Sequence, residues 1–129
     1  MGLPIITKYT NRAEFLESLN NNPGLIIIKF GAKWCGPCKI IEDDVQLLFA
    51  GMPSTVQCVN LDVDENIDLY AFMKSKKIVK GIPTLLGYFN GNTHYAPDEI
   101  TIGTDKTELR NFFVRCTNHI NFNLSFTPN

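Results

Sequence analysis

The chain has 129 residues, of which 44% are apolar and 19% charged, and this suits one globular domain with its own hydrophobic core. A formal net charge of −1 excludes a strongly basic surface for nucleic acid or an anionic membrane. No apolar run reaches the length of a membrane span, and the N-terminus turns polar too soon for a secretion signal. We therefore expect a globular domain that binds neither nucleic acid nor membrane.

Apolar periodicity and turn residues predict an alternating order of strands and helices. Residues 25–30 are apolar at nearly every position, which is typical of a central strand covered by helices on both faces. Asn90 and Gly91 predict a tight hairpin turn between the last two strands. The order β-α-β-α-β-α-β-β-α predicts parallel pairing early and an antiparallel hairpin late. The predicted strands are 4–9, 25–30, 54–62, 82–89 and 92–95, and the predicted helices are 11–19, 38–50, 66–77 and 105–120.

Several helix ends and one helix face carry specific signals. Capping-box patterns begin two helices, with Asn11 and Glu14 in the first and Asp105 and Glu108 in the last. In the helix at 38–50, apolar residues recur at helical spacing and predict its buried face. These residues are Ile40, Ile41, Val45, Leu48 and Phe49. We expect one domain at 1–119 and a C-terminal tail at 120–129.

The stretch "KWCGPCK" places two cysteines, Cys35 and Cys38, at the start of a predicted helix. Unpaired backbone N–H groups and the helix dipole favour negative charge there, so Cys35 is expected to become a nucleophilic thiolate near neutral pH. Pro37 suits the first helical turn, Gly36 leaves room for a substrate sulfur, and Trp34 offers a flat apolar surface. Cys38, one turn later, can reach the sulfur of Cys35.

Other uses of the cysteine pair fit less well. A zinc site needs four ligands, usually as two close pairs, and the remaining cysteines and histidines form no second close pair. These remaining residues are Cys58, Cys116, His94 and His119. Cys58 and Cys116 are expected to be buried and to behave as small hydrophobic residues. A structural disulfide across so small a loop would restrict the unfolded chain little. Reversible dithiol–disulfide exchange is therefore favoured, and the sparse cysteines favour a reducing, cytoplasmic compartment.

At these residues the chain resembles the thioredoxin family, whose active-site signature is Cys-Gly-Pro-Cys after a buried strand. A second shared motif is "KGIPT", in which the resemblance implies a cis peptide bond before Pro83. A third is Gly103, ahead of the last helix, which in the family borders the substrate groove. The resemblance covers roughly residues 4 to 119. It implies the α/β thioredoxin fold, with a central mixed sheet of four to five strands flanked by helices.

The resemblance also implies an activity, that of a protein-disulfide reductase. Cys35 would attack a substrate disulfide, and Cys38 would then attack Cys35 and close the bridge. The implied partners are proteins with disulfides and a thioredoxin reductase that draws on NADPH. The chain itself would be a monomer with no metal and no cofactor beyond its disulfide, and its reduction potential would lie near about −270 mV. The residues expected to line the substrate groove are Trp34, Ile82, Pro83 and Gly103.

Some positions depart from the family pattern. Lys29 stands where the family usually has a buried aspartate, and Asn60 stands where a lysine often partners that aspartate. Asp43 replaces a proline that commonly kinks the helix, and residues 96–99 are an extra stretch in the hairpin. Lys29 allows two interpretations. In the first, the aliphatic stem of Lys29 packs in the sheet and its ammonium reaches the surface. In the second, Lys29 lies under Cys38 and alters the protonation of that thiol while Cys38 resolves the mixed disulfide.

A second class of function stays open at this point. A thioredoxin fold can act as a binding or scaffold subunit of a larger complex without turning over disulfides. The stretch at 96–99 and the tail at 120–129 are the segments that could carry such a role. An isomerase or oxidant would favour histidine in place of Pro37, so it ranks below both.

Overall fold

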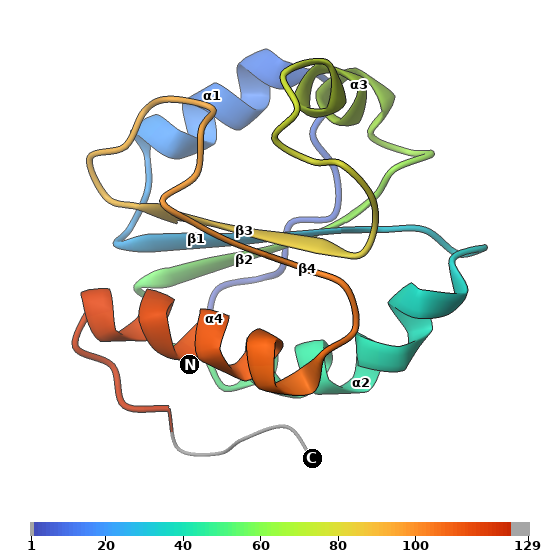
Figure 1. Ribbon diagram of the computed structural model, residues 1–129. Helices are drawn as coiled ribbons and strands as arrows, with labels where there is room; N and C mark the ends of the chain where they lie inside the picture. The colour runs from blue at the N-terminus through green and yellow to red at the C-terminus, as the bar shows by residue number, and fades with distance from the viewer. Residues whose placement is uncertain (1, 125–129) are drawn as a thin grey trace.

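The computed structural model describes residues 2–124 and shows a four-stranded mixed sheet between two layers of helices (Figure 1). The strand order is β2-β1-β3-β4, with β1 parallel to β2 and antiparallel to β3, and with β3 antiparallel to β4. The elements are α1 (Arg12–Asn20), β1 (Leu25–Gly31), α2 (Gly36–Ala50), β2 (Val56–Asp62), α3 (Ile67–Ser75), β3 (Thr84–Phe89), β4 (Glu99–Ile102) and α4 (Lys106–His119). The expected mixed sheet flanked by helices is confirmed. Within the described residues, no helix is both long and apolar enough to cross a membrane.

The core has two halves, one on each face of the sheet. Helices α1 and α3 cover one face, and α2 and α4 cover the other (Figure 1). Strand β1 is buried at every position, because its side chains alternate between the two halves. Ile26 and Ile28 belong to the first cluster, whereas Leu25 and Ile27 belong to the second. The prediction of a central strand covered on both faces is confirmed.

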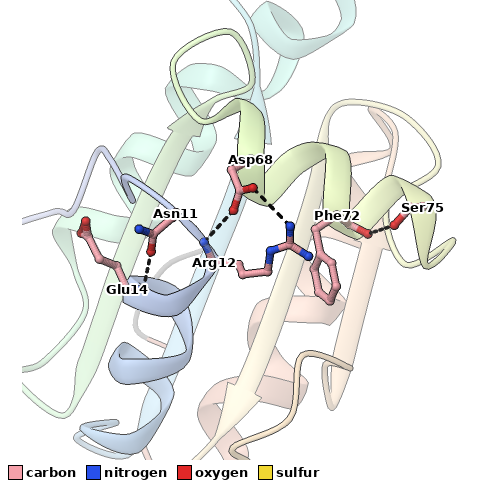
Figure 2. Close-up of polar contacts among 6 residues, drawn as sticks. All are labelled: Asn11, Arg12, Glu14, Asp68, Phe72 and Ser75. Atoms are coloured by element: carbon pink, nitrogen blue, oxygen red, sulfur yellow. Dashed lines mark hydrogen bonds and ion pairs between the residues drawn. The ribbon is translucent and has the colours of Figure 1, made fainter.

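Helix α1 begins as predicted and is held against α3 (Figure 2). The side chain of Asn11 accepts the backbone N–H of Glu14 at 3.1 Å, which is the N-cap half of the predicted capping box. The backbone N–H of Arg12 donates to the Asp68 carboxylate at 2.9 Å, and this bond is the main cause that lowers the pKa of Asp68 below its ordinary 3.8. The Arg12 guanidinium also lies 4.6 Å from the ring centroid of Phe72. Arg12 of α1 thus contacts α3 through a backbone hydrogen bond, an ion pair and a cation–π contact.

The predicted strand at 4–9 is wrong except for one residue. Ile6 forms an isolated parallel bridge to β2. Pro4 has no N–H to offer a neighbouring strand, so pairing does not extend toward the N-terminus. The N–H of Tyr9 donates to the side chain of Asn66 at 2.8 Å instead of to a strand. The segment therefore crosses the sheet edge and turns directly into α1.

The second strand of the predicted hairpin is also misplaced. Residues 92–95 form no strand, and β4 begins only at Glu99. The Asp98 carboxylate accepts the backbone N–H of Phe89 at 2.8 Å and the side-chain amide of Asn92 at 3.0 Å. This carboxylate satisfies a strand-end N–H that a tight hairpin would have paired with backbone. The extra stretch thus lies mostly in the connection, and only its last residue enters β4.

Helix α2 buries a narrower face than its sequence predicts. Ile41, Val45 and Leu48 are buried in the second cluster, but Ile40 is 57% exposed. The prediction for Ile40 is wrong, because the buried face follows Cys38, Ile41 and Val45 at spacings of three and four.

The described part of the predicted tail packs against the domain. Ile120, Phe122 and Leu124 contact the second core cluster. The backbone N–H of Phe122 donates to the carbonyl oxygen of Thr117 at 3.0 Å, which folds the chain back after α4. Residues 125–129 of the predicted tail lie outside the described residues.

Candidate active site

Three chain segments that carry predicted site residues meet at the same end of the sheet, where β1 and β4 end and β3 begins. In the strand register, Phe30 near the end of β1 lies opposite Thr84 at the start of β3, and Thr84 lies opposite Ile102 at the end of β4. The cysteine pair follows β1, Pro83 precedes β3 and Gly103 follows β4. The fold therefore gathers the cysteine turn, the proline turn and the glycine turn at the same end (Figure 1).

The two cysteines form a disulfide across the first turn of α2, with their Cα atoms 5.3 Å apart. Cys35 is the N-cap residue, and its sulfur accepts the backbone N–H of Cys38 at 3.2 Å. Gly36 and Pro37 are the first two helical residues, where a proline is tolerated because these N–H groups have no acceptor within the helix. Once the bridge is reduced, the same N–H group and the helix dipole would favour a thiolate on Cys35.

Exposure alone does not distinguish the two sulfurs, since Cys35 and Cys38 are each 4% exposed. Their surroundings differ, however. The Cys35 sulfur lies 4.0 Å from the carbonyl oxygen of Ile82, in the turn that leads to Pro83. The Cys38 sulfur lies beside the backbone of Gly31, at the end of β1. The Cys35 sulfur thus lies beside the turn before Pro83, and the Cys38 sulfur lies beside the end of β1.

Trp34 lies in the cysteine turn, and its indole ring is held by the Asp64 carboxylate in the loop that follows β2. It is 68% exposed, and its indole N–H donates to Asp64 at 2.7 Å. Asp62 accepts the backbone N–H of Asp64 at 2.8 Å and that of Lys33 at 3.3 Å. The position of Trp34 beside the disulfide is therefore set by a second loop. Asp64 was missed by the sequence reasoning, whose only signal for it was an acidic stretch after a predicted strand.

The turn before β3 contains a backbone N–H group that has no acceptor among the described residues. The Ile82–Pro83 peptide bond is cis, as the family resemblance implies, and Pro83 itself is buried. The carbonyl oxygen of Pro83 accepts the N–H of exposed Gly103 at 3.0 Å, which ties the two turns together. Gly103 has a φ of +93°, a conformation that favours glycine. Within residues 2–124 the N–H of half-buried Ile82 has no hydrogen-bond acceptor, so it is available to a bound chain.

Lys29 and Asn60 lie opposite each other in the β1–β2 ladder. Lys29 is only 5% exposed, and burial lowers the pKa of its ammonium below the ordinary 10.5, an effect that the Glu42 carboxylate partly opposes. Asn60 is half-buried and neutral. Most of the Lys29 side chain is therefore buried, although no neighbouring charge on β2 pairs with it.

Cys58 and Cys116 are buried members of the second core cluster, as expected for small hydrophobes. Burial raises the pKa of each thiol to about 12, so neither forms appreciable thiolate near neutral pH. Over the described part of the chain, no three histidine, cysteine, aspartate or glutamate residues are grouped to hold a metal ion.

A disulfide of Cys-x-x-Cys spacing at a helix N-terminus, beside the turn that leads into β3, is the arrangement of a protein that carries out thiol–disulfide exchange. The family profile described as Thioredoxin matches residues 6–115. The chain belongs to the thioredoxin family. It is a thiol–disulfide oxidoreductase of the protein-disulfide reductase class, with Cys35 and Cys38 as its redox-active pair.

Similar proteins come from several organisms. Thioredoxin-2 of Saccharomyces cerevisiae is 33% identical over 87 residues, which are 67% of this chain and 79% of that protein. Mitochondrial thioredoxin-3 of the same yeast is 42% identical over 64 residues, 50% of this chain and 49% of that protein. The crystal structure of oxidised yeast thioredoxin 3 superposes with a TM-score of 0.68 at 32% identity, covering 85% of this chain and 94% of that one. The chain thus spans most of thioredoxin-2 but about half of the mitochondrial protein.

Proposed function

We propose that Cys35 and Cys38 have different roles in a two-step reduction of protein disulfides. In the first step the Cys35 thiolate attacks a substrate disulfide, a Cys35–substrate bond forms, and one substrate sulfur leaves as a thiolate that takes up a proton. In the second step deprotonated Cys38 attacks the Cys35 sulfur, the Cys35–Cys38 bond forms, and the second substrate sulfur leaves. Two electrons pass from the dithiol to the substrate. The position of the Cys35 sulfur at the helix N-terminus, facing Ile82, carries this assignment.

The groove proposed for the substrate is formed by Trp34, Ile82, Pro83 and Gly103. Ile82 supplies an N–H without an acceptor, to which an extended segment can pair as a strand does. Trp34, next to Cys35 in the chain, offers exposed apolar surface. Gly103 has open space where a Cβ would stand, so it adds no side chain to the groove. A segment paired with Ile82 would bring its own disulfide close to the Cys35 sulfur, which lies 4.0 Å from the Ile82 carbonyl.

The proposed activity is accompanied by proposals on the cofactor, the recycling partner and the cellular location. The Cys35–Cys38 dithiol itself carries the two electrons, so the proposal needs no bound cofactor, and a thioredoxin reductase drawing on NADPH would restore the dithiol from the disulfide. We propose a monomer that works in the cytoplasm on the basis of the sparse cysteines. Related thioredoxins include mitochondrial ones, so a localisation experiment with the tagged chain tests this directly.

The recycling partner can be tested by coupling the protein to insulin reduction. With NADPH and a purified thioredoxin reductase, we expect NADPH oxidation that requires both this chain and insulin. The Cys35→Ser variant, which keeps the fold but lacks the proposed nucleophile, serves as the control and should consume no NADPH above background. If dithiothreitol sustains insulin reduction but the reductase does not, the proposed partner is wrong. If neither reductant sustains it, a binding module without turnover replaces the proposed function.

A further inference from the structure

A cavity of about 250 Å³ lies behind the dithiol, between β1, β2 and the first turns of α2. Cys38 and Lys29 both line it, together with Gly31 and Asn60. The other charged side chains around the cavity include both lysines and carboxylates, so no strong net field of one sign fills it. These are Lys33, Lys39, Glu42, Asp62 and Glu65. What distinguishes Lys29 from the other two lysines is burial, because Lys33 and Lys39 are exposed.

The Lys29 side chain and the Cys38 sulfur both border the space beside Gly31, which has no side chain of its own. A Cβ placed on Gly31 would stand 3.5 Å from the Cys38 sulfur and 3.5 Å from the Lys29 Cε, so these two atoms are no more than twice that distance apart. Within residues 2–124, the Lys29 ammonium has no hydrogen-bond or ion-pair partner. Lys29 as a residue is only 5% exposed, and the Glu42 carboxylate on the cavity wall only partly offsets the cost of burying its charge, so a further anion beside the ammonium would be favourable.

We propose that Lys29 is a positioning residue that stabilises the thiolate of Cys38 whenever the Cys35–Cys38 bridge is open. This inference rests on the proposed function, in which Cys38 resolves the mixed disulfide. The Cys38 thiol releases its proton to water in the cavity, and the thiolate then attacks the Cys35 sulfur. The Cys35–Cys38 bond forms, the Cys35–substrate bond breaks, and the substrate thiolate takes up a proton from water. Lys29 stays an ammonium throughout and transfers neither proton nor electrons.

This arrangement has two consequences for the redox pair. A lower pKa of Cys38 raises the fraction of resolving thiolate at neutral pH, so mixed disulfides are released faster. Stabilising a thiolate also stabilises the reduced protein, which makes the disulfide more oxidising than it would be without the charge. Asn60, across the ladder from Lys29, is neutral and does not cancel the effect.

The direct test measures the pKa of Cys38 from the ultraviolet absorbance of its thiolate in a Cys35→Ala background. Cys58 and Cys116 do not interfere, because their pKa values are about 12. Adding Lys29→Met should raise the pKa of Cys38 by about one unit, a tenfold change in the acid equilibrium. Lys29→Gln should act in the same direction and serves if the methionine variant folds poorly. Lys39→Met removes an exposed lysine from the same cavity and should shift the pKa by less than half as much.

A second readout uses the protein with both active-site cysteines. Equilibration with a dithiothreitol redox buffer, at a pH above the Cys38 pKa of both proteins, should show the Lys29→Met disulfide about tenfold harder to reduce, which corresponds to about 30 mV. An unchanged or lowered Cys38 pKa in both Lys29 variants overturns the inference, as does an equal shift in Lys39→Met. The titration requires no turnover, so it separates this inference from the proposed function. A wild type inactive on insulin would reject the function while leaving the pKa comparison valid.

Discussion

The Cys38→Ser variant is expected to stop after the first step and to hold a substrate protein in a mixed disulfide through Cys35. The serine hydroxyl cannot attack the Cys35 sulfur, whereas the helix N-terminus that favours the Cys35 thiolate is unchanged. Multiple-turnover insulin reduction should fall by on the order of 10³-fold, because the two cysteines act as one unit. Non-reducing gel electrophoresis and peptide mass spectrometry of the complex would place the bond.

The matched control for this trap is Cys35→Ser, which leaves Cys38 as the only active-site thiol. The Cys38 sulfur lies beside Gly31, whereas the Cys35 sulfur lies at the Ile82 turn where the substrate segment is proposed to bind, so a substrate disulfide should reach Cys38 poorly. Little covalent complex is therefore expected from this variant. Equal trapping by the two variants would show that the roles assigned from the geometry are not distinct.

The Gly87→Ala variant is expected to lose about 1–3 kcal/mol of stability, the usual cost of forcing an extra methyl group into a packed core. Gly87 is a buried residue of β3, and a Cβ there would lie 2.7 Å from the Cys116 sulfur on α4. Phe112 and Glu99 would each be 3.5 Å away, so the methyl group has no free direction. Urea denaturation followed by circular dichroism measures the loss.

A double-mutant cycle identifies the contact responsible. Cys116→Ala keeps the Cβ and removes only the sulfur, so it vacates the space that the methyl group added at Gly87 needs. The Gly87→Ala change should therefore cost clearly less in the Cys116→Ala background than in the wild type, with a coupling of about 1 kcal/mol. Strictly additive free energies of unfolding would mean that the cost arises elsewhere.

Local sequence signals predicted the parts of the fold that depend on local chemistry. The apolar run at β1 predicted a strand buried on both faces, and Asn11 and Asp105 predicted two N-caps that the structure contains. The full capping box did not form at α1, because Glu14 accepts the N–H of Thr10 rather than that of the cap residue. Such reciprocal bonds depend on how the chain enters the helix, which the pattern alone does not specify.

The errors occurred where tertiary contacts decide the structure. The apolar pattern at 4–9 resembles a strand, yet Tyr9 donates its N–H to Asn66, which lies far away in the sequence. The Asn90–Gly91 pair resembles a hairpin turn, but the Asp98 side chain satisfies the end of β3 and delays the next strand. In both cases a distant or late polar side chain replaces the strand partner that periodicity assumes.

Some features of the candidate site could be predicted from the sequence and others could not, for a similar reason. The spacing of Cys35 and Cys38 was visible in the sequence, because both lie on one helical turn. The hydrogen bond from Trp34 to Asp64 depends on the packing of two loops, and no spacing indicates it. The approach of Lys29 to Cys38 follows from the missing side chain at Gly31. Linear motifs thus locate the reacting atoms, while the groups that tune them come from the fold.

The most direct test of the account is turbidimetric insulin reduction with dithiothreitol as electron source, comparing the wild type with Cys35→Ser. Rapid insulin precipitation is expected with the wild type, and the rate with Cys35→Ser should be no greater than that of dithiothreitol alone. This result would show that the buried Lys29 is compatible with a working dithiol. A wild type no faster than Cys35→Ser would contradict the account, since the disulfide would then be present without its chemistry.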